Sequence, residues 1–161
     1  MIKGTVRRGI GRDKPEGEEG IVTVNVVVHL NFRGEARAAL TFYRSVFGGE
    51  VKIVSYGDMG AAHDRSEADQ VMWGQVDADN GFRVMAFDVL SPRPWNPGEN
   101  AFFVSLLGTA TEEIVAYWEG LADGATILHP LGPVQWTPLY GMLKDKFGVT
   151  WVMDVPEPDA A

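Results

Sequence analysis

The order of elements that the sequence predicts occurs twice, and this repeat constrains the fold more than any other feature. A strand with alternating apolar residues is followed by a helix and then by three more strands. The predicted elements of the first half are 23–32, 34–47, 50–57, 70–77 and 82–89. Those of the second half are 100–107, a helix from Thr109 to near Gly124, 125–131, 134–143 and 149–154. The halves align at an offset of 75 residues, where Gly49 falls on Gly124.

Each half on its own would leave one face of its sheet exposed. Two halves side by side can wrap a sheet around a common cavity, with the helices outside. The sequence therefore predicts an α+β protein of two βαβββ modules that form a curved mixed sheet around a cavity. We divide the chain into an N-terminal extension, a first module, a linker, a second module and a C-terminal tail, at 1–21, 22–90, 91–99, 100–155 and 156–161.

The first predicted strand has two different faces. One face is wholly apolar and carries Val24, Val26, Val28, Leu30 and Phe32. The other face is mixed and carries Asn25, Val27, His29 and Asn31. The apolar face suits packing against a helix, and the mixed face suits a partly polar cavity. His29 is therefore predicted to point into the cavity.

The composition disfavours several classes of function. The 161 residues include 14 basic and 22 acidic side chains, which give a formal net charge of −8. Binders of nucleic acid or of anionic membranes need clustered lysine and arginine, so we expect neither partner. The chain has no cysteine, which excludes disulfides, thiolate catalysis and cysteine-ligated metals. No apolar run reaches the roughly 18 residues of a membrane span, and we expect a cytoplasmic protein.

Two stretches and one aspartate resemble a known family. HLNFRGEARAALTFYRSVFGGE at 29–50 is similar to the opening of PhnB-like proteins, a branch of the vicinal-oxygen-chelate (glyoxalase/bleomycin resistance/dioxygenase) superfamily. QWTPLYGMLKDKFGVTWVMDV at 135–155 is similar to the tryptophan-containing loop and the Asp-x-Phe-Gly-x-x-Trp ending of that branch. Asp88 falls where the branch often has aspartate after its fourth strand. The resemblance covers about residues 23–155. It implies βαβββ modules that commonly pair across two chains, so we expect a homodimer.

In metal-dependent members of this family, the ligands come from the first and fourth strands of each half. The resemblance places these positions at Val28 or His29, and near Ala86, Ala101 and Val152. A single histidine cannot hold a catalytic divalent ion with useful affinity. We therefore expect no metal site and no other cofactor. For His29, a role as a cavity-lining or hydrogen-bonded residue is favoured over metal ligation and over acid–base catalysis.

Candidate ligand-binding residues come from both predicted modules. They are Asn25, His29, Trp73, Asp88, Phe103, Ser105, Trp136, Tyr140 and Thr150. A cavity with aromatic walls and few charges favours an apolar or aromatic small molecule. The first hypothesis is therefore a small-molecule-binding protein without demonstrated catalysis. Two alternatives stay open: a metal-dependent lyase, isomerase or dioxygenase, and a structural domain that only pairs with itself or with a partner.

Overall fold

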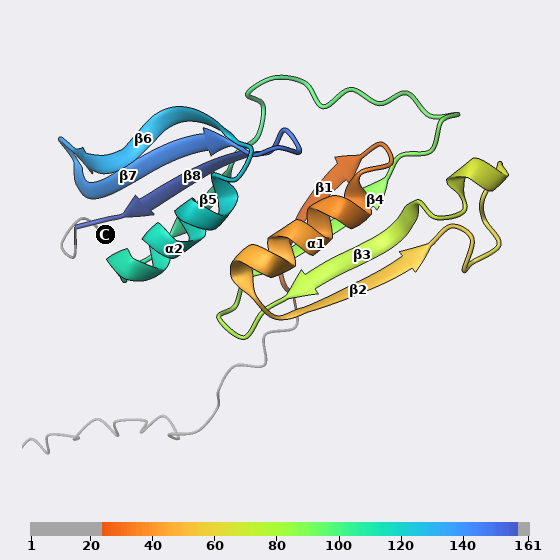
Figure 1. Ribbon diagram of the computed structural model, residues 1–161, viewed down its shortest axis with the longest axis horizontal. Helices are drawn as coiled ribbons and strands as arrows, with labels where there is room; N and C mark the ends of the chain where they lie inside the picture. The colour runs from red at the N-terminus through yellow and green to blue at the C-terminus, as the bar shows by residue number, and fades with distance from the viewer. Residues whose placement is uncertain (1–23, 158–161) are drawn as a thin grey trace, which may run out of the picture.

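Each half of the chain forms a four-stranded sheet with one helix packed on it. The computed structural model describes residues 24–157 (Figure 1). The first half contains β1 (Val28–Phe32), α1 (Ala36–Phe47), β2 (Glu50–Ser55), the 3₁₀ helix η1 (Arg65–Glu67), β3 (Val71–Asp77) and β4 (Arg83–Asp88). The second half contains β5 (Val104–Leu107), α2 (Thr111–Leu121), β6 (Thr126–Val134), β7 (Thr137–Lys144) and β8 (Thr150–Val155). The predicted order of elements is confirmed.

The two sheets have the same strand order and remain separate. Sheet A runs β1-β4-β3-β2 and sheet B runs β5-β8-β7-β6. The first strand of each half lies parallel to the last strand, and the other neighbours are antiparallel. The α+β fold of two βαβββ modules with mixed sheets is thus confirmed, and within residues 24–157 the sheets form no closed barrel. Neither helix in that range is long and apolar enough to cross a membrane.

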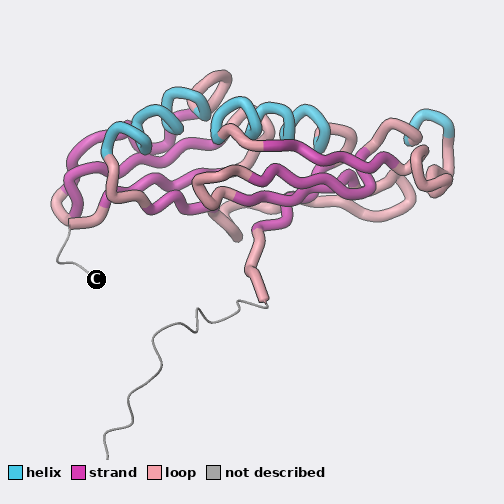
Figure 2. The backbone as a smooth tube through the Cα atoms, turned by 90° about the horizontal axis from the view of Figure 1, so that it is seen from below, coloured by secondary structure: helices cyan, strands magenta, loops and turns pink. Residues whose placement is uncertain are grey.

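Both helices lie on the same side of the molecule. Figure 2 shows α1 and α2 in one layer and the strands of both sheets in the layer beneath. The opposite side of each sheet has no helix over it. We call this side of each sheet its open face. The helices are outside the sheets as predicted, and the chain leaves both open faces uncovered in the part that the structure describes.

The first strand of each half is shorter than the sequence predicts. β1 begins at Val28, and residues 24–27 lead away from the sheet on the side opposite the helices (Figure 2). Val26 is 99% exposed. Val28 pairs with Val84, the second residue of the partner strand β4, so residues before Val27 have no residue of β4 opposite them. Likewise β5 begins at Val104 rather than at residue 100. The predicted extension at 1–21 lies outside the described residues.

Helix α1 packs closely on sheet A because small residues line the contact. Its buried stripe comprises Ala36, Ala39, Leu40, Tyr43 and Phe47. Leu40 lies over Gly74 of β3, where an added Cβ would come within 2.3 Å of its Cδ1. A larger residue than glycine at position 74 would therefore push the helix away from the sheet.

A buried carboxylate joins the two halves. Asp145 follows β7, and its Oδ2 accepts hydrogen bonds from the hydroxyl of Tyr43 and from Nε1 of Trp151, both at 2.8 Å. Its Oδ1 accepts the backbone amides of Phe147 and Val149. The rings of Tyr43 and Trp151 also meet edge to face, with their centroids 5.4 Å apart. Tyr43 belongs to α1 of the first half, so this cluster fixes α1 against the last hairpin of the second half.

The position of Tyr43 also affects its ionisation. Burial raises the pKa of the Tyr43 phenol well above its usual range, and the adjacent Asp145 carboxylate raises it further. The phenol therefore stays protonated and continues to donate its hydrogen bond.

We expect Tyr43→Phe to lower the free energy of unfolding by about 1.5–3 kcal/mol, the usual contribution of a hydrogen bond to a charged group. The change keeps the ring and removes only the hydroxyl that Asp145 accepts. Tyr117→Phe is the matched control, because the Tyr117 hydroxyl bonds the exposed carboxylate of Glu113. The control should cost less than about 1 kcal/mol. Urea unfolding measures both values, and equal losses would contradict the role given to Asp145.

Candidate functional site

The open face of sheet A combines aromatic and polar side chains. The strand register sets one row across it, of His29, Met85, Gln75 and Lys52. Beside this row lie the pairs Asn31–Phe87 and Trp73–Val54. Val28, Leu30 and Phe32 pair with the β4 residues that face α1. The predicted division of the first strand into an apolar face and a mixed face therefore agrees with the register from Val28 onward.

His29 lies on this open face and contacts an aromatic neighbour. Its imidazole meets the ring of Phe87 edge to face, with the centroids 5.4 Å apart and the planes at 83°. Trp73 precedes Gly74, which pairs with Ala86, so strand alternation places Trp73 on the same face as Phe87, and it is half-buried. These three aromatic side chains therefore lie on the same face of the sheet. We call His29, Trp73 and Phe87 the aromatic patch of sheet A.

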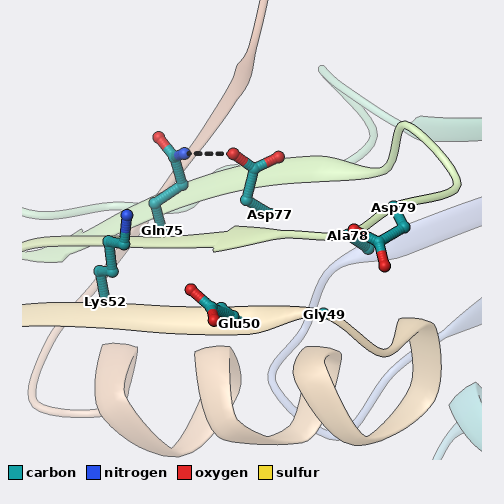
Figure 3. A pocket seen from close by; sticks show the side chains of 7 residues that line it. All are labelled: Gly49, Glu50, Lys52, Gln75, Asp77, Ala78 and Asp79. Atoms are coloured by element: carbon teal, nitrogen blue, oxygen red, sulfur yellow. Dashed lines mark hydrogen bonds between the residues drawn. The ribbon is translucent and has the colours of Figure 1, made fainter.

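A polar hollow of about 500 Å³ lies beside this patch, at the end of the sheet near Gly49. Figure 3 shows the side chains that line it, which are Glu50, Lys52, Gln75, Asp77, Ala78 and Asp79. Asp77 already forms a bidentate ion pair with Arg83, with Nη2 2.9 Å from Oδ2. Gln75 also donates to Asp77 at 3.4 Å. The carboxylate of Asp77 is therefore largely occupied by residues of its own sheet.

The open face of sheet B carries a second aromatic cluster. The rings of His129 and Tyr140 meet edge to face at 5.2 Å, and those of Trp136 and Tyr140 at 5.6 Å. Tyr140 pairs with Asp154 on β8, whose carboxylate accepts the hydroxyl of Thr137 at 2.7 Å. Trp136 is 64% exposed at the turn between β6 and β7. The structure thus offers aromatic surface on both open faces.

The structure brings most of the sequence-predicted residues onto the open faces. His29 and Trp73 lie on sheet A, and by strand alternation Ser105, Tyr140 and Thr150 lie on sheet B. Phe103 directly precedes β5, and Trp136 occupies the β6–β7 turn. Asn25 lies before β1, in the segment that leaves the sheet, so it does not join the others.

Asp88 was also predicted to bind a ligand, but it lies on the opposite face of the sheet from the other predicted residues, toward α1. Only 1% of it is exposed, and its Oδ1 and Oδ2 accept the backbone amides of Ala36 and Val71 at 3.0 and 2.8 Å. It therefore satisfies a free amide at the start of α1 and another at the start of β3. The alternation of Val84, Ala86 and Asp88 along β4 already indicates this face.

Sequence reasoning missed three residues of the aromatic clusters and their surroundings. Met85 and Phe87 alternate with the helix-facing residues of β4, so strand periodicity could have placed them beside His29. His129 is absent from the predicted set, and its ring packs on Tyr140. The register of β6 shifts on both sides of His129, and periodicity alone cannot follow such a bulged strand.

The donors on the open faces do not fit a divalent metal ion. The β4 neighbour of His29 is Met85, and Ala86 faces the helix. In sheet B, Val152 pairs with Ser105, while Ala101 lies before β5. Divalent ions in proteins are held by several histidine, carboxylate or thiolate ligands. Within residues 24–157, no three such side chains are grouped to hold one.

Comparison with known proteins gives a family and two similar structures. A family model described as the Glyoxalase/Bleomycin resistance protein/Dioxygenase superfamily matches residues 26–153. Protein PA1353 from Pseudomonas aeruginosa is 27% identical, with a TM-score of 0.73, over 83% of this chain and 98% of that one. The PhnB protein from Bacillus cereus is 26% identical, with a TM-score of 0.61, over 82% of this chain and 99% of that one. No curated protein matches the chain.

The donor set leads to a prediction about metal content. Protein purified without chelator should contain zinc, nickel, iron and manganese at well below one ion per chain, because His29 faces Met85 rather than a second ligand. Elemental analysis by mass spectrometry gives the ratio. A near-stoichiometric content that falls in a His29→Ala variant would show that a metal is bound through this residue.

Proposed function

We propose a function for this chain from the premise that it belongs to the Glyoxalase/Bleomycin resistance protein/Dioxygenase superfamily. The chain binds an apolar or aromatic small molecule on its open sheet faces, without a metal ion. It acts in the cytoplasm, in keeping with its lack of cysteine. The observation that carries this proposal is the aromatic patch of His29, Trp73 and Phe87 on a sheet face that the chain leaves uncovered.

The chemistry of the patch favours a flat apolar ligand. Aromatic rings that meet edge to face leave part of their surface free for a further ring. Gln75 and Asn31 flank the patch and supply amide groups that can orient a polar substituent of the ligand. Small-molecule sites commonly combine apolar and aromatic walls with a few polar groups of this kind.

A second copy of the chain would complete the site. The open face of sheet B exposes large apolar side chains that its own chain does not cover, among them Leu107 at 70% and Phe103 at 43%. Contact between the open faces of two copies would remove this surface from water. It would also turn the shallow aromatic clusters into an enclosed cavity. We therefore propose that the chain functions as a homodimer.

Ligand binding is tested by thermal unfolding in the presence of a panel of neutral aromatic small molecules. A ligand at 100 times its dissociation constant adds about 2.7 kcal/mol of stability, so a rise in melting temperature of several degrees is expected. His29→Ala should abolish the rise, because it removes the edge of the patch. Glu119→Ala, on the exposed side of α2, is the control that should keep it. Failure of every compound would favour the alternative of a purely structural domain.

The oligomeric state is tested by light scattering coupled to size exclusion. The wild-type protein should have twice the chain mass of 17.6 kDa. Leu107→Asp should reduce the mass to one chain, because it places a charge on the open face of sheet B. Ala116→Asp adds the same charge to the exposed side of α2 and should leave the dimer intact. A monomeric wild-type protein would refute the proposed dimer.

A further inference from the structure

A second hollow lies on the same side of sheet A, at the opposite end from the polar one. It has a volume of about 340 Å³ and is bounded by the segments after β2 and after β4. Its lining residues are Tyr56, Ala61, His63, Met72, Phe87, Leu90, Pro92 and Arg93. This volume is at the lower end of the range for small-ligand pockets, which is about 300–1,000 Å³. We call it the Arg93 pocket.

The floor of the Arg93 pocket is apolar and continuous with the aromatic patch. Phe87 lines the pocket and also contacts His29 at 5.4 Å, so the two regions share a ring. Met72, Leu90 and Pro92 extend this apolar floor. Methionine sulfur and aromatic rings make favourable contacts with one another. The body of a ligand that fits this floor is therefore apolar or aromatic.

The rim of the pocket is polar and carries a cation. Arg93, His63 and Tyr56 all line it. The backbone of Arg93 is held at both ends: its amide donates to the carbonyl of Leu90 at 3.0 Å, and its carbonyl accepts the guanidinium of Arg33. Burial raises the pKa of the Tyr56 phenol, the guanidinium of Arg93 opposes that rise, and the carboxylates of Asp88 and Glu67 add to it.

The carboxylates that raise the pKa of Tyr56 are those of Asp88 and Glu67, and each accepts hydrogen bonds from other residues. Both oxygens of Asp88 accept backbone amides on the helix side of the sheet. One oxygen of Glu67, Oε1, accepts both the amide and the hydroxyl of Ser91, at 3.0 and 2.6 Å, while its Oε2 is buried and has no hydrogen-bond partner among the described residues. The ion pairs within residues 24–157 are Arg83–Asp77 and Lys146–Asp123, and neither involves Arg93. Arg93 thus lines the pocket without a salt-bridge partner among the described residues.

We propose that the Arg93 pocket binds the carboxylate of an apolar or aromatic small acid. The guanidinium of Arg93 holds the carboxylate, His63 and Tyr56 flank it, and the body of the acid lies on Phe87 and Met72. Arginine suits this role because its planar group donates two parallel hydrogen bonds to a carboxylate. This inference rests on the proposed small-molecule binding and narrows the ligand to small carboxylic acids with an apolar or aromatic body.

Benzoate and benzyl alcohol test the proposal, because they share a ring and differ in charge. Titration of the full-length protein, followed by the backbone amide signals of residues 56–63 and 87–93, gives both affinities. Benzoate should bind about tenfold more tightly than benzyl alcohol, because its carboxylate can form a charge-assisted hydrogen bond with Arg93. Arg93→Gln should reduce the affinity for benzoate to that for benzyl alcohol. Arg83→Gln makes the same change at the other end of the sheet and should keep the preference.

The outcomes separate this inference from the proposed function. Equal affinities for the two ligands, no binding of benzoate, or a preference that survives in Arg93→Gln would each overturn the carboxylate site. Binding of benzyl alcohol that is lost in His29→Ala would still support the proposed function in those cases. A preference for benzoate that requires Arg93 and not Arg83 would support the inference.

Discussion

The carboxylate of Asp145 accepts hydrogen bonds from groups on both halves of the chain, and the relative position of the halves depends on it. The donors are the hydroxyl of Tyr43, the indole of Trp151 and two backbone amides of its own turn. A buried carboxylate needs several such donors to offset the loss of its hydration. Two sequence motifs, one in each half, are therefore parts of a single hydrogen-bonded cluster.

The joint at Asp145 has consequences for the opposite side of the molecule. Because α1 packs against the last hairpin of the second half, both helices lie in one layer (Figure 2). The sheets then turn their other faces in a common direction, away from the helices. Packing on the helix side uses small and apolar residues such as Ala36 and Gly74. The aromatic and polar residues that can bind a ligand remain on the open side, as do both hollows.

Two aspartates, Asp88 and Asp145, each hold separate segments of the fold together through hydrogen bonds. Asp145 accepts the amides of its own turn, and it also accepts donors from distant side chains. Asp88 was placed in the predicted ligand site, yet it caps α1 and holds the start of β3. A residue near the end of a strand lies close to both faces of the sheet. A family motif alone therefore does not predict on which face its side chain lies. The alternation along β4 predicts the face of Asp88, because Asp88 follows Val84 and Ala86 at every second residue.

The sequence by itself determined the order of elements, the α+β class and the face on which His29 lies. These follow from local periodicity, since alternation along a strand and the spacing of apolar residues along a helix are properties of adjacent residues. Only the tertiary structure decided where strands begin, which residues share a pocket and what joins the halves. β1 starts at Val28, which pairs with Val84 near the beginning of β4. The Arg93 pocket unites residues 56–63 with 87–93, and Tyr43 meets Asp145 across about 100 residues. Contacts between such distant segments depend on how the sheets pack, and no local pattern encodes them.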